Sequence, residues 1–365
     1  MNYPENNSGP TLENRSGWFT RRGELFDTVI STRLRLSRNG ELSRFPATME
    51  KKEKEELIGR LSTFFRSQAP FNGKSRSFAM DEISAEERKI LVERKILSPR
   101  HEGETNGRII QGGDESINVL LCMDDHIQFV GLRTGFALPE LHGELSLLAG
   151  ETEKVFPFAR DEARGYLTSR ISEAGAGLRA SVIMQLPALS LMEDMEPLFL
   201  ALMDRGLSIR GFMDDEDRSR GGLYQIYNGG SAGYRSEEEI LNSFSEAVKI
   251  LSKKEEACRS EINRGHYPQL EDRIYRSLGL LRYCRLLSAG EAFKHLMLVR
   301  QGVALGWINE ISLETLSALS LFTGNAHIEG ILVEEGRESN GEEADERRAR
   351  LVRETLAGGL TYFSV

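Results

Sequence analysis

Several features that would place this chain in a special class of protein are scarce in its sequence. It has three cysteines among 365 residues, Cys122, Cys258 and Cys284, and their wide spacing excludes a disulfide framework or a zinc site built on cysteine. The longest nearly apolar stretch, residues 180–192, is too short to cross a bilayer, and the polar N-terminus lacks a signal-peptide core. We therefore expect a cytoplasmic protein that neither spans a membrane nor holds a metal through its side chains.

An excess of positive charge is absent as well. The chain carries 47 basic and 56 acidic side chains, which gives a formal net charge of −9. This balance excludes a broadly basic surface for nucleic acid, so no nucleic-acid partner is expected. Hydrophobic residues make up 39% of the sequence, enough for a sizeable core, and the length favours two domains or one large domain with an appendage.

The first part of the chain predicts short strands alternating with helices. Residues 1–17 are polar and are expected to be a flexible lead-in. Alternation over residues 28–37 predicts a half-buried strand, and apolar spacing over residues 48–65 predicts a helix with Thr48 as its N-cap. Further strands are expected at residues 117–123, 127–131, 178–189 and 223–227, with a buried helix at residues 192–205. The fold class predicted for residues 18–254 is α+β, with a mixed, largely antiparallel sheet flanked by helices.

The last third of the chain predicts helices alone. Ser236 and Glu239 form a capping box in front of an amphipathic helix. Beyond a border near residue 254, helical spacing recurs in residues 274–287, 292–303 and 313–322, so residues 255–365 are expected to form an all-helical domain. The charged tract 334–350 predicts a solvated loop leading into a surface helix.

Two arginines on the predicted strand 28–37 are the first candidates for chemistry. Arg33 and Arg35 lie two residues apart on one strand face, roughly 7 Å from each other. Arginine suits polyphosphate because its charge is fixed and its donors form a planar fork. The alternative is a strand whose outer face is merely charged.

Two further segments carry polar residues beside predicted strands. Asp124 and Asp125 follow the strand 117–123, where neighbouring carboxylates either face water in a turn or hold a cationic group. His126, taken alone, is as consistent with a structural histidine as with a functional one. Gly175 and Gly177 precede Arg179, a pattern that fits a close backbone approach to a ligand or an ordinary tight turn.

Taken in order, these segments resemble the ATP:guanido phosphotransferases, most closely the bacterial protein arginine kinase branch. The resemblance covers residues 18 to 355. It is carried by these stretches: Ser31-Thr-Arg-Leu-Arg-Leu-Ser-Arg-Asn39, Asp125-His126, Gly165-Tyr-Leu-Thr-Ser169, Gly177-Leu-Arg-Ala-Ser-Val182, Leu186-Pro-Ala-Leu189, Arg210-Gly211, Leu223-Tyr-Gln-Ile226, Glu271-Asp-Arg-Ile-Tyr-Arg-Ser277 and Val299-Arg-Gln-Gly-Val-Ala-Leu-Gly306.

The resemblance implies a guanido-kinase catalytic fold followed by a helical dimerisation domain. It implies transfer of the ATP γ-phosphoryl, with Mg²⁺, to arginine side chains of protein substrates. Carried over by position, Arg33, Arg35, Arg179 and His126 are the expected nucleotide-binding residues, and Asp124 and Asp125 the catalytic acids. It also implies an activator protein, an ATP-dependent protease that recognises phosphoarginine, and a homodimer.

The sequence departs from the family pattern on the side that receives the phosphoryl group. The motif Asn-Glu-Glu-Asp-His reads Cys122-Met-Asp-Asp-His126 here, and the usual reactive cysteine is Arg170. Other substitutions lie nearby: Gln128 replaces an arginine, Lys95 a histidine, Ile171-Ser-Glu173 the sequence Pro-Thr-Asn, and Arg218 an acidic loop residue. Asp214, Asp215, Glu216 or Asp217 are candidates to replace the lost acids.

Two hypotheses follow from these departures. The first is a protein arginine kinase whose activity is weak or depends on a partner. The second is an inactive pseudokinase that binds phosphoarginine proteins or regulates an active kinase. The stretch Ala344-Asp-Glu-Arg-Arg-Ala349 resembles the phosphoarginine-binding motif Arg-Asp-x-x-Arg-Ala, so Asp345 and Arg348 are the expected phosphoarginine ligands, against the alternative of a surface helix rich in ion pairs. A kinase of free arginine is less expected, because about thirty residues before the arginine strand leave no room for its usual helical domain.

Overall fold

The computed structural model describes residues 17–41, 43–73, 75–193, 195–211, 222–229, 236–337 and 340–358. Within them, one eight-stranded sheet runs through the first two thirds of the chain, and every neighbouring pair of its strands is antiparallel. The strands, in spatial order, are β2 (Arg76–Ala79), β3 (Arg108–Gln111), β4 (Ile117–Leu121), β5 (Ile127–Thr134), β1 (Val29–Arg38), β8 (Leu178–Gln185), β10 (Leu223–Asn228) and β9 (Leu207–Gly211). The predicted α+β class is confirmed.

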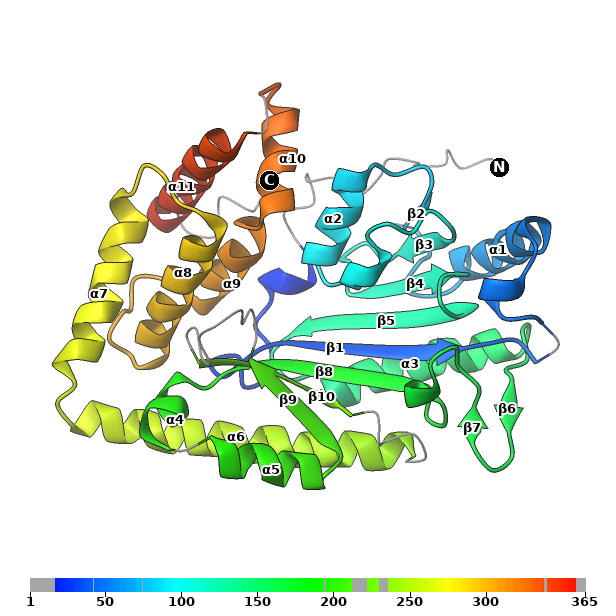
Figure 1. Ribbon diagram of the computed structural model, residues 1–365, viewed down its shortest axis with the longest axis horizontal. Helices are drawn as coiled ribbons and strands as arrows, with labels where there is room; N and C mark the ends of the chain where they lie inside the picture. Colours follow the sequence, from blue (N-terminus) through cyan, green and yellow to red (C-terminus); the bar gives the residue numbers. More distant parts are fainter. Residues whose placement is uncertain are drawn as a thin grey trace.

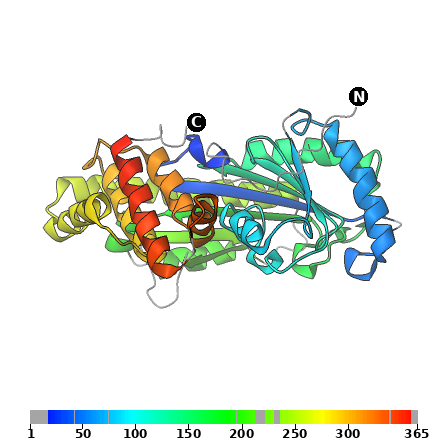
Figure 2. The same ribbon diagram turned by 90° about the horizontal axis from the view of Figure 1, so that it is seen from above.

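Helices cover the sheet, and a group of helices lies beyond one end of it. Figure 1 shows α7 to α11 gathered at one end of the molecule and α1 at the other, and Figure 2 shows the same separation from above. The α-helices are α1 (Lys51–Arg66), α2 (Ala85–Glu93), α3 (Leu138–Glu153), α4 (Pro187–Met192), α5 (Glu196–Asp204), α6 (Glu237–Arg264), α7 (Pro268–Tyr283), α8 (Ala289–Ala304), α9 (Leu313–Phe322), α10 (Asn325–Glu334) and α11 (Gly341–Gly358). The short elements are η1 (Trp18–Thr20), η2 (Pro46–Thr48), η3 (Pro99–His101), η4 (Ile171–Glu173), β6 (Arg160–Asp161) and β7 (Gly165–Tyr166). No described helix is long and apolar enough to span a bilayer.

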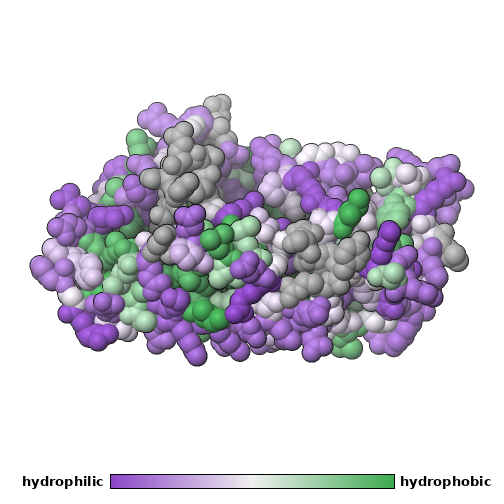
Figure 3. All heavy atoms as spheres, turned by 60° about the horizontal axis from the view of Figure 1, so that its bottom comes forward, coloured by the Kyte–Doolittle hydropathy of each residue, from purple (hydrophilic) through white to green (hydrophobic). Residues whose placement is uncertain are grey.

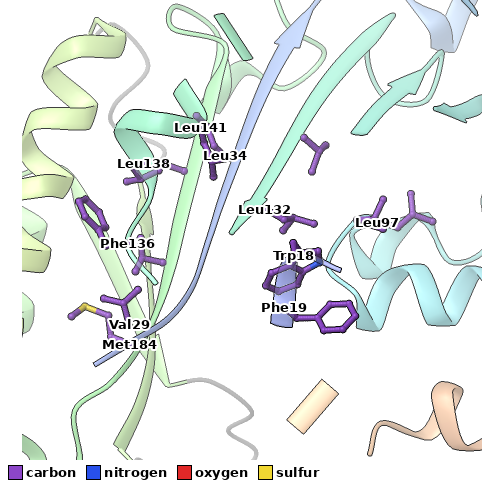
Figure 4. Close-up of a cluster of buried hydrophobic side chains, with 14 of the residues drawn as sticks. Trp18, Phe19, Val29, Leu34, Leu97, Leu132, Phe136, Leu138, Leu141 and Met184 are labelled. Carbon is purple, nitrogen blue, oxygen red and sulfur yellow. The ribbon is translucent and has the colours of Figure 1, made fainter. Parts of the chain in front are cut away.

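Strand β1 is central in the sheet and is buried on both faces. It pairs with β5 on one side and with β8 on the other. Leu34 packs beside Leu138 and Leu141 of α3, whereas Trp18 and Phe19 lie with Leu132 against the opposite face (Figure 4). The prediction of a half-buried strand was therefore wrong, because α3 covers one face while other chain segments cover the face that carries Arg33 and Arg35.

Several predicted boundaries needed correction. The helix predicted from Thr48 begins at Lys51, where Glu50 rather than Thr48 is the N-cap and forms a capping box with Glu53. The strand predicted over residues 178–189 ends at Gln185, since Pro187 starts α4. The three stretches predicted as helical overlap α7, α8 and α9, but α7 begins at Pro268 and ends at Tyr283, four residues before the predicted end. α6 runs without interruption through the predicted border near residue 254.

The helix predicted as buried over residues 192–205 is largely exposed. α5 buries Leu202, while Leu200 is 57% and Met203 63% exposed. Figure 3 shows hydrophobic side chains among charged ones on the face around α4 and α5. The apolar composition of α5 misled the prediction, because this helix lies outside the edge strand β9 rather than between two layers.

A buried polar network joins the sheet to the helical end of the molecule. Glu93, the last residue of α2, accepts hydrogen bonds from the backbone N–H groups of Ala326 and His327 at the start of α10. Arg94 donates to His327 Nε2 at 3.2 Å and to Glu115 at 2.5 Å. His327 Nε2 is thus an acceptor, so its Nδ1 carries the proton and donates to Glu93 at 2.6 Å.

Candidate active site

Three predicted arginines meet on one face of the sheet. Arg35 of β1 lies directly opposite Arg179 of β8 in the antiparallel register, and Arg33 lies two residues before Arg35 on the same face. Arg33 donates to the carbonyl oxygens of Lys95 at 2.8 Å and Ile96 at 3.3 Å. Arg179 donates to the carbonyl oxygen of Asn228 at 2.7 Å and lies over the ring of Tyr227. Backbone oxygens thus fix two of these guanidinium groups.

Two further arginines that sequence reasoning did not select face the same region. Arg100 lies in η3, and Arg170 directly precedes η4. Partial burial, followed by the like charge of Arg35, lowers the pKa of Arg100, and the charge of Arg170 adds to this effect. Among the described residues, five arginines are therefore close enough to influence one another: Arg33, Arg35, Arg100, Arg170 and Arg179.

The accumulated positive charge changes how these arginines titrate. Burial lowers the pKa of Arg33 to about 9, and the charges of Arg35, Arg100 and Arg179 act in the same direction. Its guanidinium still carries a full charge at neutral pH. Burial likewise lowers the pKa of Arg179. A bound anion would stabilise the charged forms of these arginines, which burial and mutual repulsion destabilise. The cluster therefore has the electrostatics of an anion-binding site.

One glutamate provides a counter-charge inside the cluster. Both carboxylate oxygens of Glu173, the last residue of η4, lie 2.5 Å from Nη2 of Arg35. The two side chains are 3% and 4% exposed. Glu173 stands where the family pattern has asparagine. The sequence therefore showed this substitution but not its ion pair with Arg35.

Asp124 and Asp125 lie in the tight turn between β4 and β5, as predicted. Asp124 pairs with Arg100, and its Oδ2 is 3.2 Å from His101 Nε2 and 3.9 Å from Arg170 Nε. Partial burial opposes ionisation of Asp124, but the hydrogen bond to His101 and the charges of His101, Arg100 and Arg170 outweigh it and hold the pKa of the carboxyl well below its usual range. Its side chain is 26% exposed, so it borders the surface of the site.

Asp125 points into the protein. It accepts hydrogen bonds from the side chain of Asn39 at 2.7 Å, the backbone of Ser169 at 2.8 Å and the side chain of Gln128 at 3.0 Å. Gln128 replaces the arginine of the family pattern, and its amide is occupied by this carboxylate. Asp125 is 1% exposed, so its contacts position the turn and the segment at Ser169 rather than reach an acceptor.

His126 is fully buried beside the same turn. Its Nδ1 lies 2.9 Å from the side-chain oxygen of Asn39 and accepts from the backbone N–H of Gly40 at 3.3 Å. Its ring packs near Phe45 and Phe156. Burial lowers its pKa. The assignment of His126 to the nucleotide stays a prediction, while its contacts in the structure are with the end of β1 and with aromatic side chains.

The glycines before Arg179 serve the packing of the chain on itself. Gly177 has a φ of +58°, and a Cβ at this position would lie 2.8 Å from the carbonyl oxygen of Ser37. The close backbone approach is therefore to β1 rather than to a ligand. It brings β8 into register with β1 at the point where Arg179 meets Arg35.

The predicted phosphoarginine ligands lie away from this site, on α11. Arg348 is 1% exposed. It donates to the carbonyl oxygens of Thr323 and Leu287 at 2.8 Å, to Asp345 at 2.6 Å and to Asn325 at 2.9 Å. Asp345 and Arg348 pair with each other, and the guanidinium of Arg348 is engaged in holding three segments together, so their role as phosphoarginine ligands stays a prediction. The expectation of a wholly solvated surface helix is wrong at this position.

Some residues named in the sequence analysis lie outside the part of the chain that the structure describes. Asp214, Asp215, Glu216, Asp217 and Arg218 lie outside the described residues, as do residues 1–16 of the predicted N-terminal lead-in. Within the described part of the chain, no group of three histidine, cysteine or acidic side chains is arranged to hold a metal ion.

Comparison with known proteins decides the family. A model of the ATP:guanido phosphotransferase C-terminal catalytic domain matches residues 56–258, and a model of the protein-arginine kinase McsB C-terminal domain matches residues 267–360. Protein-arginine kinases of Bacillus subtilis and Geobacillus kaustophilus are 33% and 34% identical to the chain, each across 93% of both sequences. This chain belongs to the protein-arginine kinase family.

Solved structures agree with the fold. A duplicated taurocyamine kinase from Schistosoma mansoni with bound transition state analog components is similar with a TM-score of 0.55 at 22% identity, over 76% of this chain and 40% of that one. Lombricine kinase gives a TM-score of 0.55 at 18% identity, over 72% and 74% of the two chains. The predicted guanido-kinase fold is therefore confirmed, with the family's helical C-terminal domain.

Proposed function

We propose that this protein binds the phosphates of ATP with Arg33, Arg35 and Arg179 and transfers the γ-phosphoryl group to arginine side chains of proteins, weakly or with the help of a partner. The observation that carries the proposal is the meeting of these guanidinium groups on one sheet face, in electrostatic reach of the Arg100–Asp124 pair. Phosphoryl transfer depends mainly on positioning and charge neutralisation, and fixed arginines supply both.

Of the two predicted catalytic acids, Asp124 is the one with access to an acceptor. Its carboxylate would orient the guanidinium of a substrate arginine and draw a proton from it. Two features make it a poor base: the lowered pKa weakens its affinity for a proton, and Arg100 and Arg170 repel an incoming guanidinium. Weak activity follows from this environment, and a partner that moved Arg170 away from Asp124 would raise it.

Magnesium would enter with the nucleotide. The described side chains form no cage for it, which fits the preference of Mg²⁺ for phosphate oxygens and water when it accompanies a nucleotide. The ion would offset phosphate charge while the arginines of the cluster hold the polyphosphate.

A pseudokinase is the second candidate, and the ion pair between Asp124 and Arg100 favours it. In this reading the acceptor acid is neutralised, and the protein binds phosphoarginine proteins or regulates an active kinase. Phosphoarginine recognition by Asp345 and Arg348, a homodimer, an activator protein and a link to an ATP-dependent protease belong to the proposal under either candidate. Phosphoarginine would have to exchange contacts with Arg348, because that side chain is already engaged.

The test combines transfer and binding. The protein is incubated with γ-labelled ATP, Mg²⁺ and an arginine-rich protein, and acid-labile, alkali-stable label is measured. We expect low incorporation that disappears in Asp124→Asn and falls strongly in Arg179→Lys, with Arg133→Lys, whose side chain pairs with Glu144 outside the cluster, as the matched control. No incorporation together with ATP binding would select the pseudokinase. No binding at millimolar ATP would refute the kinase and leave only a pseudokinase that acts by binding proteins or phosphoarginine.

A further inference from the structure

The Arg35–Glu173 pair places an anion of the protein itself where the proposed function places phosphate. Arg35 is the residue of β1 that faces Arg179, and its Nη2 is held by both oxygens of Glu173. A carboxylate and a phosphate present the same recognition surface to a guanidinium, namely negatively charged oxygens that accept N–H bonds. Glu173 therefore satisfies Arg35 as a phosphate oxygen would.

The influence of Glu173 extends beyond this one partner. Its negative charge favours the charged forms of Arg33, Arg100 and Arg179, in opposition to burial and to the mutual repulsion of the arginines. Without this carboxylate, the cluster would hold its like charges with much less compensation. Glu173 is thus a counter-ion shared by several arginines of the cluster, beside Asp124, which pairs with Arg100.

The hydrogen-bonding capacity of the Arg35 guanidinium is not fully used. Its Nε–H is buried and has no hydrogen-bond partner among the residues that the structure describes. Glu173 approaches only Nη2, so it leaves this donor unused. A ligand with more acceptor oxygens than one carboxylate, such as a polyphosphate, would match the donors of this guanidinium more completely.

The position of Glu173 in the chain allows an exchange of this kind. It ends the single-turn element η4, next to Arg170, whose side chain is 43% exposed. The backbone of this segment is anchored, because Gly177 N–H donates to the carbonyl oxygen of Glu173. Every hydrogen bond and ion pair of the Glu173 carboxylate among the described residues is with Arg35, so displacement of the carboxylate breaks one buried ion pair and leaves this backbone contact in place.

We propose that Glu173 is an intramolecular competitor of nucleotide phosphate, holding Arg35 until a polyphosphate displaces it. This inference rests on the proposed function, because it assumes that the arginine cluster receives the phosphates of ATP. It assigns to Glu173 the role of setting nucleotide affinity: the carboxylate stabilises the empty site and weakens binding by the free energy needed to release Arg35.

The experiment measures binding of inorganic tripolyphosphate and of ATP to the full chain by calorimetry. In Glu173→Gln, the charge is lost while size is kept, and we expect both dissociation constants to fall at least about tenfold, since the competing anion is gone and close charge pairs couple by at least that much. Glu153→Gln, which removes an equal charge paired with Arg160 outside the cluster, should change neither constant more than about twofold.

Thermal unfolding provides the second readout. Free Glu173→Gln should melt below the wild type because its arginines lack their counter-ion, and tripolyphosphate should raise its melting temperature more than that of the wild type. Should this variant fail to fold, Glu173→Asp replaces it, because it keeps the charge but shortens the reach to Arg35. In Glu173→Asp we expect the dissociation constants of tripolyphosphate and ATP to fall less than in Glu173→Gln. If the folded variants bind ATP with the affinity of the wild type, the inference is overturned but the proposed function is kept. If neither the wild type nor any variant binds ATP, the inference and the proposed function are both overturned.

Discussion

The carboxylates of Asp124 and Asp125 are neighbours in the chain but lie in opposite environments. Asp124 faces Arg100, His101 and Arg170 at the edge of the site, whereas Asp125 is buried among amide donors. In this tight turn the two side chains meet different surroundings, so one can serve chemistry while the next serves the framework.

The two acids should therefore respond differently to neutralisation. Asp125→Asn turns an acceptor of three hydrogen bonds partly into a donor, and we expect the free energy of unfolding to fall by about 1–3 kcal/mol. Asp124→Asn, at a partly exposed position, should destabilise the protein less while abolishing transfer. Urea unfolding of both variants checks this, and a larger loss of stability for Asp124→Asn would contradict the division of roles.

Arg348 is predicted to be a stabilising residue of the helical region. Arg348→Ala removes hydrogen bonds to Thr323, Leu287 and Asn325 and leaves buried acceptors unpaired, so we expect a loss of roughly 3 kcal/mol or more. Arg350→Ala, on the exposed side of the same helix, should cost less than about 0.5 kcal/mol. Denaturant unfolding measures both. Equal effects would mean that the buried contacts of Arg348 contribute little.

The junction between α2 and α10 should weaken in mild acid. Burial lowers the pKa of His327, and the charge of Arg94 adds to this, although the hydrogen bond to Glu93 opposes it. A histidine with a lowered pKa in the folded state contributes stability that is complete above its unfolded pKa of about 6.5 and is lost as the pH falls toward the folded value. We expect the free energy of unfolding to decrease below about pH 6.5, by up to about 1.4 kcal/mol per pH unit from this group.

The control for this pH dependence is His327→Gln. Glutamine keeps a donor and an acceptor but does not titrate, so its unfolding curve should be flatter between pH 7 and 5 than that of the wild type. Parallel curves for the two proteins would assign the dependence to other groups.

The cysteines should react slowly with thiol reagents. Burial raises the pKa of Cys122 to about 12, and it also raises the pKa values of Cys258 and Cys284. Since the thiolate is the nucleophile, alkylation by iodoacetamide at pH 8 should be far slower than in the urea-unfolded chain. Mass spectrometry follows the labelling. Rapid labelling of Cys122 in the native protein would refute this account.

Local patterns predicted much of the fold and part of the site. The capping box at Ser236 starts α6, and the pairing of Arg33 and Arg35 on one strand face is a direct consequence of the two-residue period of a strand. The burial of β1 on both faces and the exposure of α5 were not predictable in this way. The burial of β1 and the exposure of α5 depend on which other elements pack against each face. The pattern of polar and apolar residues in an element does not say which elements these are.

The sequence by itself determined the family, several of the strands and helices, and which side chains carry charge, because these follow from local residue types and ordered motifs. Only the tertiary structure decided which charges meet. Glu173 reaches Arg35 across 138 positions of the chain, Arg100 neutralises Asp124, and Arg348 is buried against Leu287 rather than exposed. Such partners are chosen by strand register and helix packing, since electrostatic energy depends on distance in space and on burial, and neither is written in the spacing of residues along the chain.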